Sequence, residues 1–191
     1  HRAWDIGVRD DTSIWWVQVV GGQVYVLDFY STSGVGVDHY AEEIQKRATE
    51  HGWQNGTDFV PHDAKVKEWG TGRTRVETMQ AHGLNPQVVP QAGLLDGINA
   101  ARLTLPRCVF HERCEEGLAA LEQYRREWDD DKKAFRASPL HDWTSHGADA
   151  FRYLALAWRA ISPAIPKPPQ PVVSTVQDLI PPPIEQTRRR R

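Results

Sequence analysis

Methionine, cysteine and long apolar runs are all scarce in this chain. Its 191 residues contain one methionine, Met79, and begin with His1, so we expect a domain cut from a longer polypeptide. No apolar run approaches the ~20 residues that span a bilayer, which argues against a membrane protein. The two cysteines, Cys108 and Cys114, fit neither a C-x-x-C redox motif nor a zinc knuckle. The alternative is a metal site that includes the intervening His111, but we interpret both as ordinary thiols of a reducing compartment.

A strong positive charge is missing as well. The net charge is −2 even though the last four residues are all arginine. The protein as a whole therefore does not attract nucleic acid, and any contact with DNA must come from a local basic patch. Tryptophan, by contrast, is abundant. We expect most of the eight tryptophans in the core, and base stacking by Trp69 or Trp143 has no support in the sequence.

The chain opens with three predicted strands and continues with helices and short strands. We predict an antiparallel meander over residues 2–9, 14–20 and 23–30, because apolar residues dominate there and Gly21-Gly22 marks a two-residue hairpin. Apolar spacing predicts helices over 37–51, 73–82, 94–104, 112–127 and 145–161, and short strands over 58–61 and 86–90. This order indicates a mixed α/β layer fold, built as one domain over residues 1–161.

Residues 162–191 differ in composition from the rest of the chain. They are rich in proline, contain few large apolar residues and end in Arg188-Arg189-Arg190-Arg191. We predict a flexible, extended tail of the polyproline type for this segment.

Three acidic residues stand in apolar surroundings, where an unpaired carboxylate is costly. Asp5 interrupts the first predicted strand, Asp63 follows the apolar run at 59–61, and Asp149 begins the apolar part of the last predicted helix. Brought together, three carboxylates repel one another unless a divalent cation binds between them. The pattern is typical of a metal-dependent phosphoryl-transfer site. The structural alternatives are a solvent-exposed strand acid at Asp5, a cap at Asp63 and a first-turn acid at Asp149.

Further polar residues surround these acids. His146 lies three residues before Asp149 and so shares its helix face, while Asp142 precedes the helix either as its cap or as a ligand. Gly7 leaves room beside Asp5 for a ligand or a substrate backbone. The candidate DNA contacts are Lys65, Lys67, Arg73, Arg75 and Arg102, whose alternative role is that of solvated loop charges.

Five short motifs, in this order, resemble the C-terminal nuclease domain of the phage terminase large subunit. They are Asp-Ile-Gly-x-x-Asp-Asp-Thr (5–12), Val-Pro-His-Asp-Ala (60–64), Asp-Gly-Ile-Asn-Ala-Ala-Arg (96–102), Cys-x-x-Gly-Leu-x-x-Leu-x-x-Tyr (114–124) and His-Asp-Trp-x-Ser-His-Gly-Ala-Asp-Ala-Phe-Arg-Tyr (141–153). The resemblance spans roughly residues 2–160. It implies an RNase H-like fold and an endonuclease that cuts concatemeric double-stranded phage DNA during genome packaging with two Mg²⁺ or Mn²⁺ ions.

The resemblance also implies roles for individual residues. Asp5 matches the acid on the family's first strand and bridges the two ions, and Asp63 matches the acid after the fourth strand. Asp11 resembles an accessory acid near the second metal. For the third acid we favour Asp149, with His146 as a further ligand. Asp142, bending in from its loop, is the alternative.

Partners follow from the same resemblance. It implies double-stranded DNA, an N-terminal ATPase domain in the full-length protein, the portal and the small terminase subunit, all in the host bacterial cytoplasm. This chain contains no G-x-x-x-x-G-K-[ST] phosphate loop, so the ATPase is not part of it. The alternatives are a non-catalytic docking domain of the packaging machine, or another RNase H-like nuclease of the resolvase or transposase type.

Overall fold

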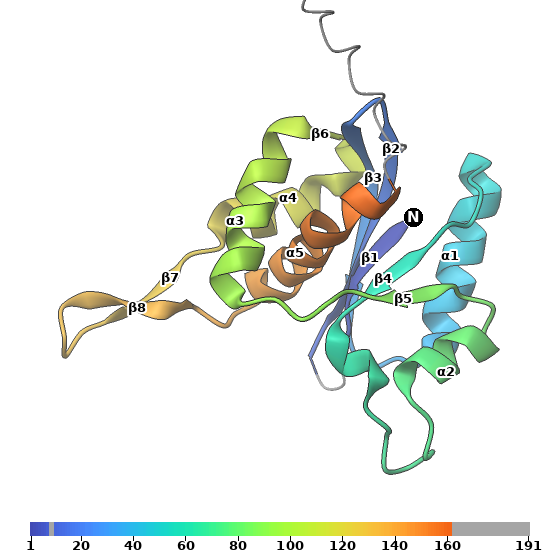
Figure 1. Ribbon diagram of the computed structural model, residues 1–191, viewed down its shortest axis with the longest axis horizontal. Coiled ribbons are helices and arrows are strands. Elements are labelled where there is room, and N and C mark those ends of the chain that lie inside the picture. Colours follow the sequence, from blue (N-terminus) through green and yellow to red (C-terminus); the bar gives the residue numbers. More distant parts are fainter. Residues whose placement is uncertain (8–9, 162–191) are drawn as a thin grey trace, which may run out of the picture.

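A six-stranded sheet lies between two layers of helices in the computed structural model, which describes residues 1–7 and 10–161 (Figure 1). The strands of this sheet are β1 (Arg2–Asp5), β2 (Thr12–Val20), β3 (Gln23–Thr32), β4 (Asp58–Val60), β5 (Pro86–Val88) and β6 (Cys108–Phe110). The α-helices are α1 (Val37–His51), α2 (Arg75–Ala81), α3 (Leu94–Thr104), α4 (Glu115–Gln123) and α5 (Thr144–Ile161). The tail predicted over 162–191 lies outside the described residues and stays a prediction.

The order of the strands is β5-β4-β1-β2-β3-β6, which places β1 in the interior of the sheet. The first three strands form the predicted antiparallel meander, and β4, β5 and β6 join it as parallel neighbours of β1, β4 and β3. The predicted mixed α/β fold is therefore confirmed. Because β4 runs parallel to β1, the carboxyl ends of both strands reach the same edge of the sheet, where ligands gather in open α/β folds.

Successive side chains of β1 point to opposite faces of the sheet. Ala3 packs into the apolar cluster that contains Phe151 of α5. Trp4 and Ile6 belong to the cluster on the other face, together with Tyr40 of α1. Figure 1 shows the same division, with α3, α4 and α5 on one side of the sheet and α1 and α2 on the other. Asp5 therefore points toward α5, as strand alternation predicts.

Helices α4 and α5 approach the sheet closely. A Cβ atom at Gly117 would lie 2.3 Å from the ring of Trp15 and 2.6 Å from that of Phe29, so only glycine allows α4 to pack at this distance. The buried indole Nε1 of Trp15 donates a hydrogen bond of 2.9 Å to the backbone oxygen of Gly147. This bond fixes the first turns of α5 against β2 and beside β1.

Several predicted elements need correction. The helix predicted over 112–127 is a short 3-10 helix (Glu112–Cys114) followed by α4, which ends at Gln123. The chain then forms an unpredicted hairpin of β7 (Arg126–Asp129) and β8 (Ala134–Pro139), which projects from the body in Figure 1. Trp128 and Phe135 pack edge to face across this hairpin, with ring centroids 4.9 Å apart. Strand β6 was also missed, and the strand predicted over 2–9 ends at Asp5, with residues 8 and 9 outside the described residues.

Two aspartates that the sequence analysis passed over are buried in the sheet. Asp58, on β4, accepts hydrogen bonds from Arg2 at 2.5 and 2.9 Å and from the indole of Trp4 at 2.9 Å. Asp28, on β3, accepts one at 2.5 Å from Arg47 of α1. Each buried carboxylate is thus neutralised by a guanidinium group, which makes its burial tolerable.

The two cysteines are free thiols. Burial raises the pKa of Cys108 to about 12 and that of Cys114 to about 11, so both stay protonated at neutral pH. Both are thus ordinary buried or partly buried thiols, and the reducing compartment stays a prediction. Among the described helices, none is long and apolar enough to cross a membrane.

Candidate metal centre

Asp5 and His146 meet at the carboxyl end of β1. The Nδ1 atom of His146, in the first turns of α5, lies 3.1 Å from Oδ2 of Asp5, and both side chains are largely buried. The hydrogen bond to Asp5 raises the pKa of His146 above its usual value, and the charges of Asp5, Asp11 and Asp10 add to this effect. The two motifs that contain Asp5 and His146 are therefore brought into direct contact across 141 residues of sequence.

Asp149 lies one turn further along the same face of α5. Its Oδ1 atom accepts hydrogen bonds from Nε and Nη2 of Arg152 at 2.9 and 2.8 Å. Burial nevertheless raises the pKa of Asp149, and repulsion by Asp5 raises it further, against the opposing effect of Arg152. A cation between Asp5 and Asp149 would relieve this repulsion and favour the ionised form of both.

Asp63 lies beyond the end of β4, the parallel neighbour of β1. It lies in a 3-10 helix (His62–Lys65) that follows β4 after one residue, and 53% of its side-chain surface is exposed. Nη1 of Arg75 lies 3.6 Å from its carboxylate, and Nε of the same arginine lies 3.5 Å from Glu68. Arg75 also donates a hydrogen bond of 3.5 Å to the backbone oxygen of Ile6, just beyond β1. The guanidinium group thus connects the two strand ends that carry Asp5 and Asp63.

The pKa of one tyrosine, Tyr153, is affected by all three predicted acids. Burial raises the pKa of Tyr153 to about 12, and the charges of Asp5, Asp149 and Asp63 all contribute to the rise. The hydroxyl group therefore lies in the field of all three carboxylates. The sequence analysis gave Tyr153 no role at the site. Its spacing of four residues from Asp149 could have placed it at the site.

Asp142 has a structural role. Its Oδ1 atom accepts hydrogen bonds from the backbone N–H and the hydroxyl of Thr144 at 2.9 and 2.5 Å, at the start of α5. These bonds lower the pKa of Asp142. The carboxylate caps the helix, which is the first of the two roles that the sequence left open.

The tight turn after β1 carries Asp10 and Asp11. The hydroxyl of Thr12 is hydrogen-bonded to both the N–H and the oxygen of Gly7, at 3.1 and 3.2 Å. A Cβ atom on Gly7 would lie 2.3 Å from the backbone oxygen of Asp10 and 2.7 Å from that of Asp11. The space at Gly7 is therefore filled by the chain's own carbonyls, and the prediction that it admits a ligand was wrong.

Comparison with solved structures gives close matches in fold at low sequence identity. The P22 large terminase nuclease domain superposes with a TM-score of 0.62 and 18% identity, covering 83% of this chain and 80% of that one. The nuclease domain of the large terminase g2p from bacteriophage SPP1, solved with bound Mn, gives 0.59 and 15%, covering 83% and 85%. This chain has the fold of the large-terminase nuclease domains. The predicted RNase H-like architecture is confirmed on this basis.

The match to a longer large terminase is partial. The large terminase of a thermophilic bacteriophage gives a TM-score of 0.59 at 18% identity over 81% of this chain, but the chain spans only 38% of that protein. No protein-family model matches the sequence, and no curated protein matches it either.

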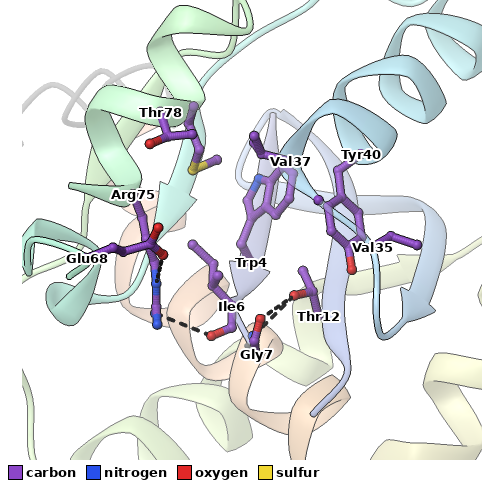
Figure 2. Close-up of a pocket in the computed structure, with 12 residues that line it drawn as sticks. Trp4, Ile6, Gly7, Thr12, Val35, Val37, Tyr40, Glu68, Arg75 and Thr78 are labelled. Carbon is purple, nitrogen blue, oxygen red and sulfur yellow. Dashed lines mark hydrogen bonds and ion pairs between the residues drawn. The ribbon is translucent and has the colours of Figure 1, made fainter. Parts of the chain in front are cut away.

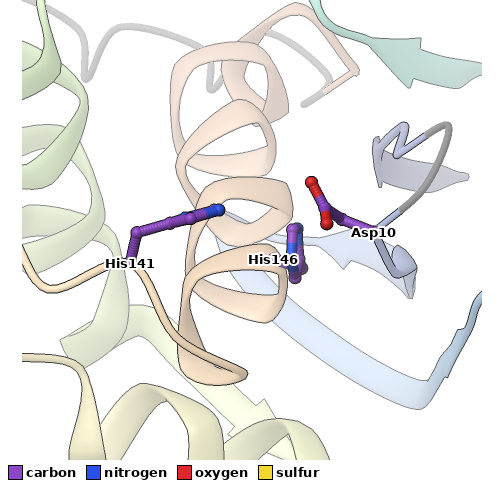
Figure 3. Close-up of side chains that lie close together, drawn as sticks. All are labelled: Asp10, His141 and His146. Atoms are coloured by element: carbon purple, nitrogen blue, oxygen red, sulfur yellow. The ribbon is translucent and has the colours of Figure 1, made fainter.

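A second group of potential ligands stands beside the acids of this terminase nuclease fold. One ligand atom each from Asp10, His141 and His146 lies within 4.8 Å of the others. Figure 3 shows the two imidazole rings and the carboxylate turned toward one another, from the turn after β1, the segment before α5 and α5 itself. The sequence analysis included His146 but missed Asp10 and His141. The two histidines are five residues apart and only His146 lies in α5, so helix periodicity did not predict that they approach each other.

The candidate DNA-binding cations lie on two sides of the site. Lys65, Lys67 and Arg73 are exposed near Asp63, whereas Arg102 is exposed on α3. Arg75 is only half-buried but is engaged with Asp63 and Glu68. Trp69 is fully exposed among the cations of the loop before α2.

A cavity of about 230 Å³ lies on the other face of the sheet from α5. Its lining is mostly apolar, and Figure 2 shows Trp4 and Ile6 in the middle, with Arg75 and Glu68 on one side of them and Tyr40 on the other. The three predicted acids do not line it. The cavity therefore borders the metal centre through Arg75 and the turn at Gly7 but is not part of it.

Proposed function

We propose that this domain is a divalent-metal-dependent endonuclease that hydrolyses double-stranded DNA during phage genome packaging. The observation that carries the proposal is the contact of Asp5, at the carboxyl end of a central strand, with His146, one turn from Asp149 on α5; Arg75 links the same strand end to Asp63. The shared fold of the P22 and SPP1 nuclease domains supports it. The docking-domain alternative gives no reason for three neighbouring carboxylates that are only partly neutralised by His146, Arg152 and Arg75.

The donor set fits hard divalent cations. Asp5, Asp63 and Asp149 offer carboxylate oxygens, which Mg²⁺ and Mn²⁺ prefer, and the SPP1 domain was solved with bound Mn. We propose that these three residues hold two ions, with Asp11 and His146 as additional ligands. Ions bound there would activate water for attack on the phosphodiester and stabilise the leaving oxygen.

The chain's own residues prepare these carboxylates. An ionised carboxylate only accepts hydrogen bonds, so His146 donates its Nδ1–H to Asp5 and orients it. Arg152 holds Oδ1 of Asp149 and so fixes the direction of its other oxygen. Burial raises the pKa of Tyr153 to about 12, so its hydroxyl stays protonated at neutral pH.

Phosphate contacts would come from the exposed cations around the site. We propose that Lys65, Lys67 and Arg73 contact one part of the DNA backbone and Arg102 another. Because phosphate contacts carry no base information, cleavage should depend little on sequence. Arg75, held by two carboxylates, would contact DNA less directly than the others.

The further partners are proposals on the same grounds. The large terminase from the thermophilic bacteriophage, of which this chain spans 38%, has also been solved with ADP. We propose that this domain follows an ATPase domain in its full-length protein and works with the portal and the small terminase subunit in the bacterial cytoplasm.

Nicking of supercoiled plasmid tests the proposal. Wild type, Asp5→Asn and Asp149→Asn are compared in Mn²⁺, Mg²⁺ and EDTA. We expect metal-dependent nicking by the wild type only. Asp142→Asn is the matched control, because asparagine also caps a helix but removes the negative charge, and it should cut normally.

Three results would contradict parts of this assignment. Cutting in EDTA, or undiminished cutting by Asp5→Asn, would exclude the proposed metal mechanism. Loss of cutting in Asp142→Asn with retention in Asp149→Asn would make Asp142 the third ligand. A wild type that binds no Mn²⁺ by calorimetry and cuts nothing would leave the docking domain as the better description.

A further inference from the structure

The cluster of Asp10, His141 and His146 differs in chemistry from the three carboxylates beside it. It offers two imidazole nitrogens and one carboxylate, whereas Asp5, Asp63 and Asp149 offer oxygen alone. Imidazole favours borderline transition metals such as Zn²⁺, while carboxylates alone suit Mg²⁺ and Mn²⁺. Three protein ligands with a remaining open position are also the usual composition of a zinc site that binds water or substrate.

The contact with Asp5 prepares His146 for this role. Because Asp5 takes the hydrogen on Nδ1, the lone pair of the neutral ring is on Nε2, which is left for a cation. A histidine that binds a metal through one nitrogen almost always donates the other N–H to a carboxylate or carbonyl, which fixes the ring and increases its basicity. The Asp5–His146 pair has this arrangement.

The distances require only a small adjustment. Ligand atoms bound about 2.0–2.1 Å from a tetrahedral zinc ion lie about 3.3 Å from one another. The three ligand atoms here are within 4.8 Å. Asp10 and His141 are exposed, so their side chains can rotate inward without disturbing the core, and His146 is already held by Asp5.

We propose that Asp10, His141 and His146 form a separate site for a borderline divalent transition metal, with Zn²⁺ as the representative ion. Asp5 supports this site through His146. Asp5 is also the central acid of the proposed Mg²⁺ or Mn²⁺ site, and His146 is a candidate ligand there too. The two sites are therefore coupled, because His146 has one free ring nitrogen and can bind one ion at a time. The binding of Zn²⁺ does not depend on the proposed nuclease function; only its effect on cleavage does.

Calorimetric titration of the metal-free domain with ZnCl₂ tests the site directly. We expect one Zn²⁺ per chain that excess Mg²⁺ does not displace. His141→Asn and Asp10→Asn each remove a ligand, and Asp5→Asn removes the supporting charge. Loss of such a supporting partner typically lowers metal affinity about 10–100-fold, and loss of a ligand should lower it at least as much. His82→Asn, which changes an exposed histidine after α2, should bind Zn²⁺ like the wild type.

Substitution by Co²⁺ gives an independent spectroscopic test. A bound Co²⁺ should give a visible d–d band that disappears in His141→Asn and persists in His82→Asn. Circular dichroism and thermal unfolding confirm that each variant is folded. The proposal would be overturned if the wild type bound no Zn²⁺. It would also be overturned if Asp10→Asn, His141→Asn and Asp5→Asn all bound Zn²⁺ as tightly as the wild type.

The two proposals fail separately. Mg²⁺-dependent nicking without stoichiometric Zn²⁺ binding would keep the nuclease and remove the second site. Zn²⁺ binding that needs His141, in a domain that never cuts DNA, would keep the site and remove the nuclease.

Discussion

Asp58 and Asp28 lie deep in the sheet and are each held by an arginine, whereas Asp5 and Asp149 lie at its edge and are only partly neutralised. All four have apolar residues on at least one side in the sequence. The buried pair are structural, because a guanidinium group compensates each charge inside the protein. At the edge, Asp5 is hydrogen-bonded to His146. The pKa of Asp149 is raised by burial although Arg152 opposes this rise. An acid in apolar sequence is therefore a sign of function only where the protein does not neutralise it.

Removal of a buried acid should have the largest effect on stability. Asp58→Ala leaves the guanidinium of Arg2 buried without its partner, which typically costs about 3–5 kcal/mol of the free energy of unfolding. Urea denaturation followed by circular dichroism measures it. In the double variant Arg2→Met/Asp58→Leu neither charge remains, so the loss should be clearly smaller. Equal losses in the single and double variants would mean that the ion pair is not what makes Asp58 necessary.

Removal of an acid at the sheet edge should instead abolish DNA cleavage and leave stability almost unchanged. Asp5→Asn keeps a hydrogen-bonding partner for His146 but removes the charge that would bind metal. We expect nicking to fall by about 10³-fold or more, since several kcal/mol of transition-state stabilisation are lost. The metal-free free energy of unfolding should change by less than ~1 kcal/mol, because asparagine keeps the contact with His146 and removes the repulsion between Asp5 and Asp149. A loss of stability as large as that of Asp58→Ala would place Asp5 among the structural acids.

The pH dependence should separate the two groups further. The pKa of His146 is raised by Asp5, so its protonation stabilises the fold fully below the unfolded value of 6.5, and this contribution is lost as pH rises through the raised folded pKa. Asp149, whose pKa is also raised, changes stability in the same direction at lower pH. We expect the melting temperature of the metal-free domain to decline as pH rises above 6.5, and Mn²⁺ affinity to increase, because the metal competes with protons.

Asp5→Asn is the control for this pH effect. Without the Asp5 charge, the pKa of His146 should fall back and the decline in melting temperature above pH 6.5 should shrink. An unchanged profile in Asp5→Asn would assign the pH dependence to another group.

The smallest effect should come from Arg75, which contacts the exposed Asp63. Arg75 contacts Asp63 at 3.6 Å, and such half-exposed pairs contribute about 0–1 kcal/mol. Arg75→Ala should free Asp63 for metal and raise Mn²⁺ affinity by up to about fivefold, with little change in stability. Calorimetry measures the affinity, and Lys65→Ala, an exposed cation on the same short helix as Asp63, is the comparison. A large decrease in affinity in Arg75→Ala would show that the arginine positions Asp63 instead of competing for it.

The elements that depend on local pattern were predictable, and those that depend on partners were not. The helix over 37–51 and the meander follow from apolar spacing and a Gly-Gly turn. The β7–β8 hairpin was missed because its sequence is polar and charged, and its strands are supported by each other and by the Trp128–Phe135 contact. The contact between Asp5 and His146 was likewise invisible in the sequence, because 141 residues separate them.

The candidate site shows the same limit. Asp5, Asp63 and Asp149 were predicted from their motifs, but Tyr153, Asp10 and His141 were not. The approach of Asp10 and His141 to His146 depends on the tertiary fold, which no periodicity reports, whereas Tyr153 could have been placed by its spacing from Asp149. Asp28 and Asp58 were overlooked for a similar reason. The arginines that neutralise them lie far away in the sequence, on α1 and at the start of β1.

The pair of Arg2 and Asp58 also determines where the edge acids stand. These residues are opposite each other in the parallel pairing of β1 and β4, so their bonds hold the two strands in one alignment. A shift of one residue along β1 would turn Asp5 from α5 toward the opposite face of the sheet. This buried ion pair thus fixes the ends of β1 and β4 relative to each other, and a variant that loosens it should disturb the spacing of the proposed ligands Asp5 and Asp63 before it unfolds the domain.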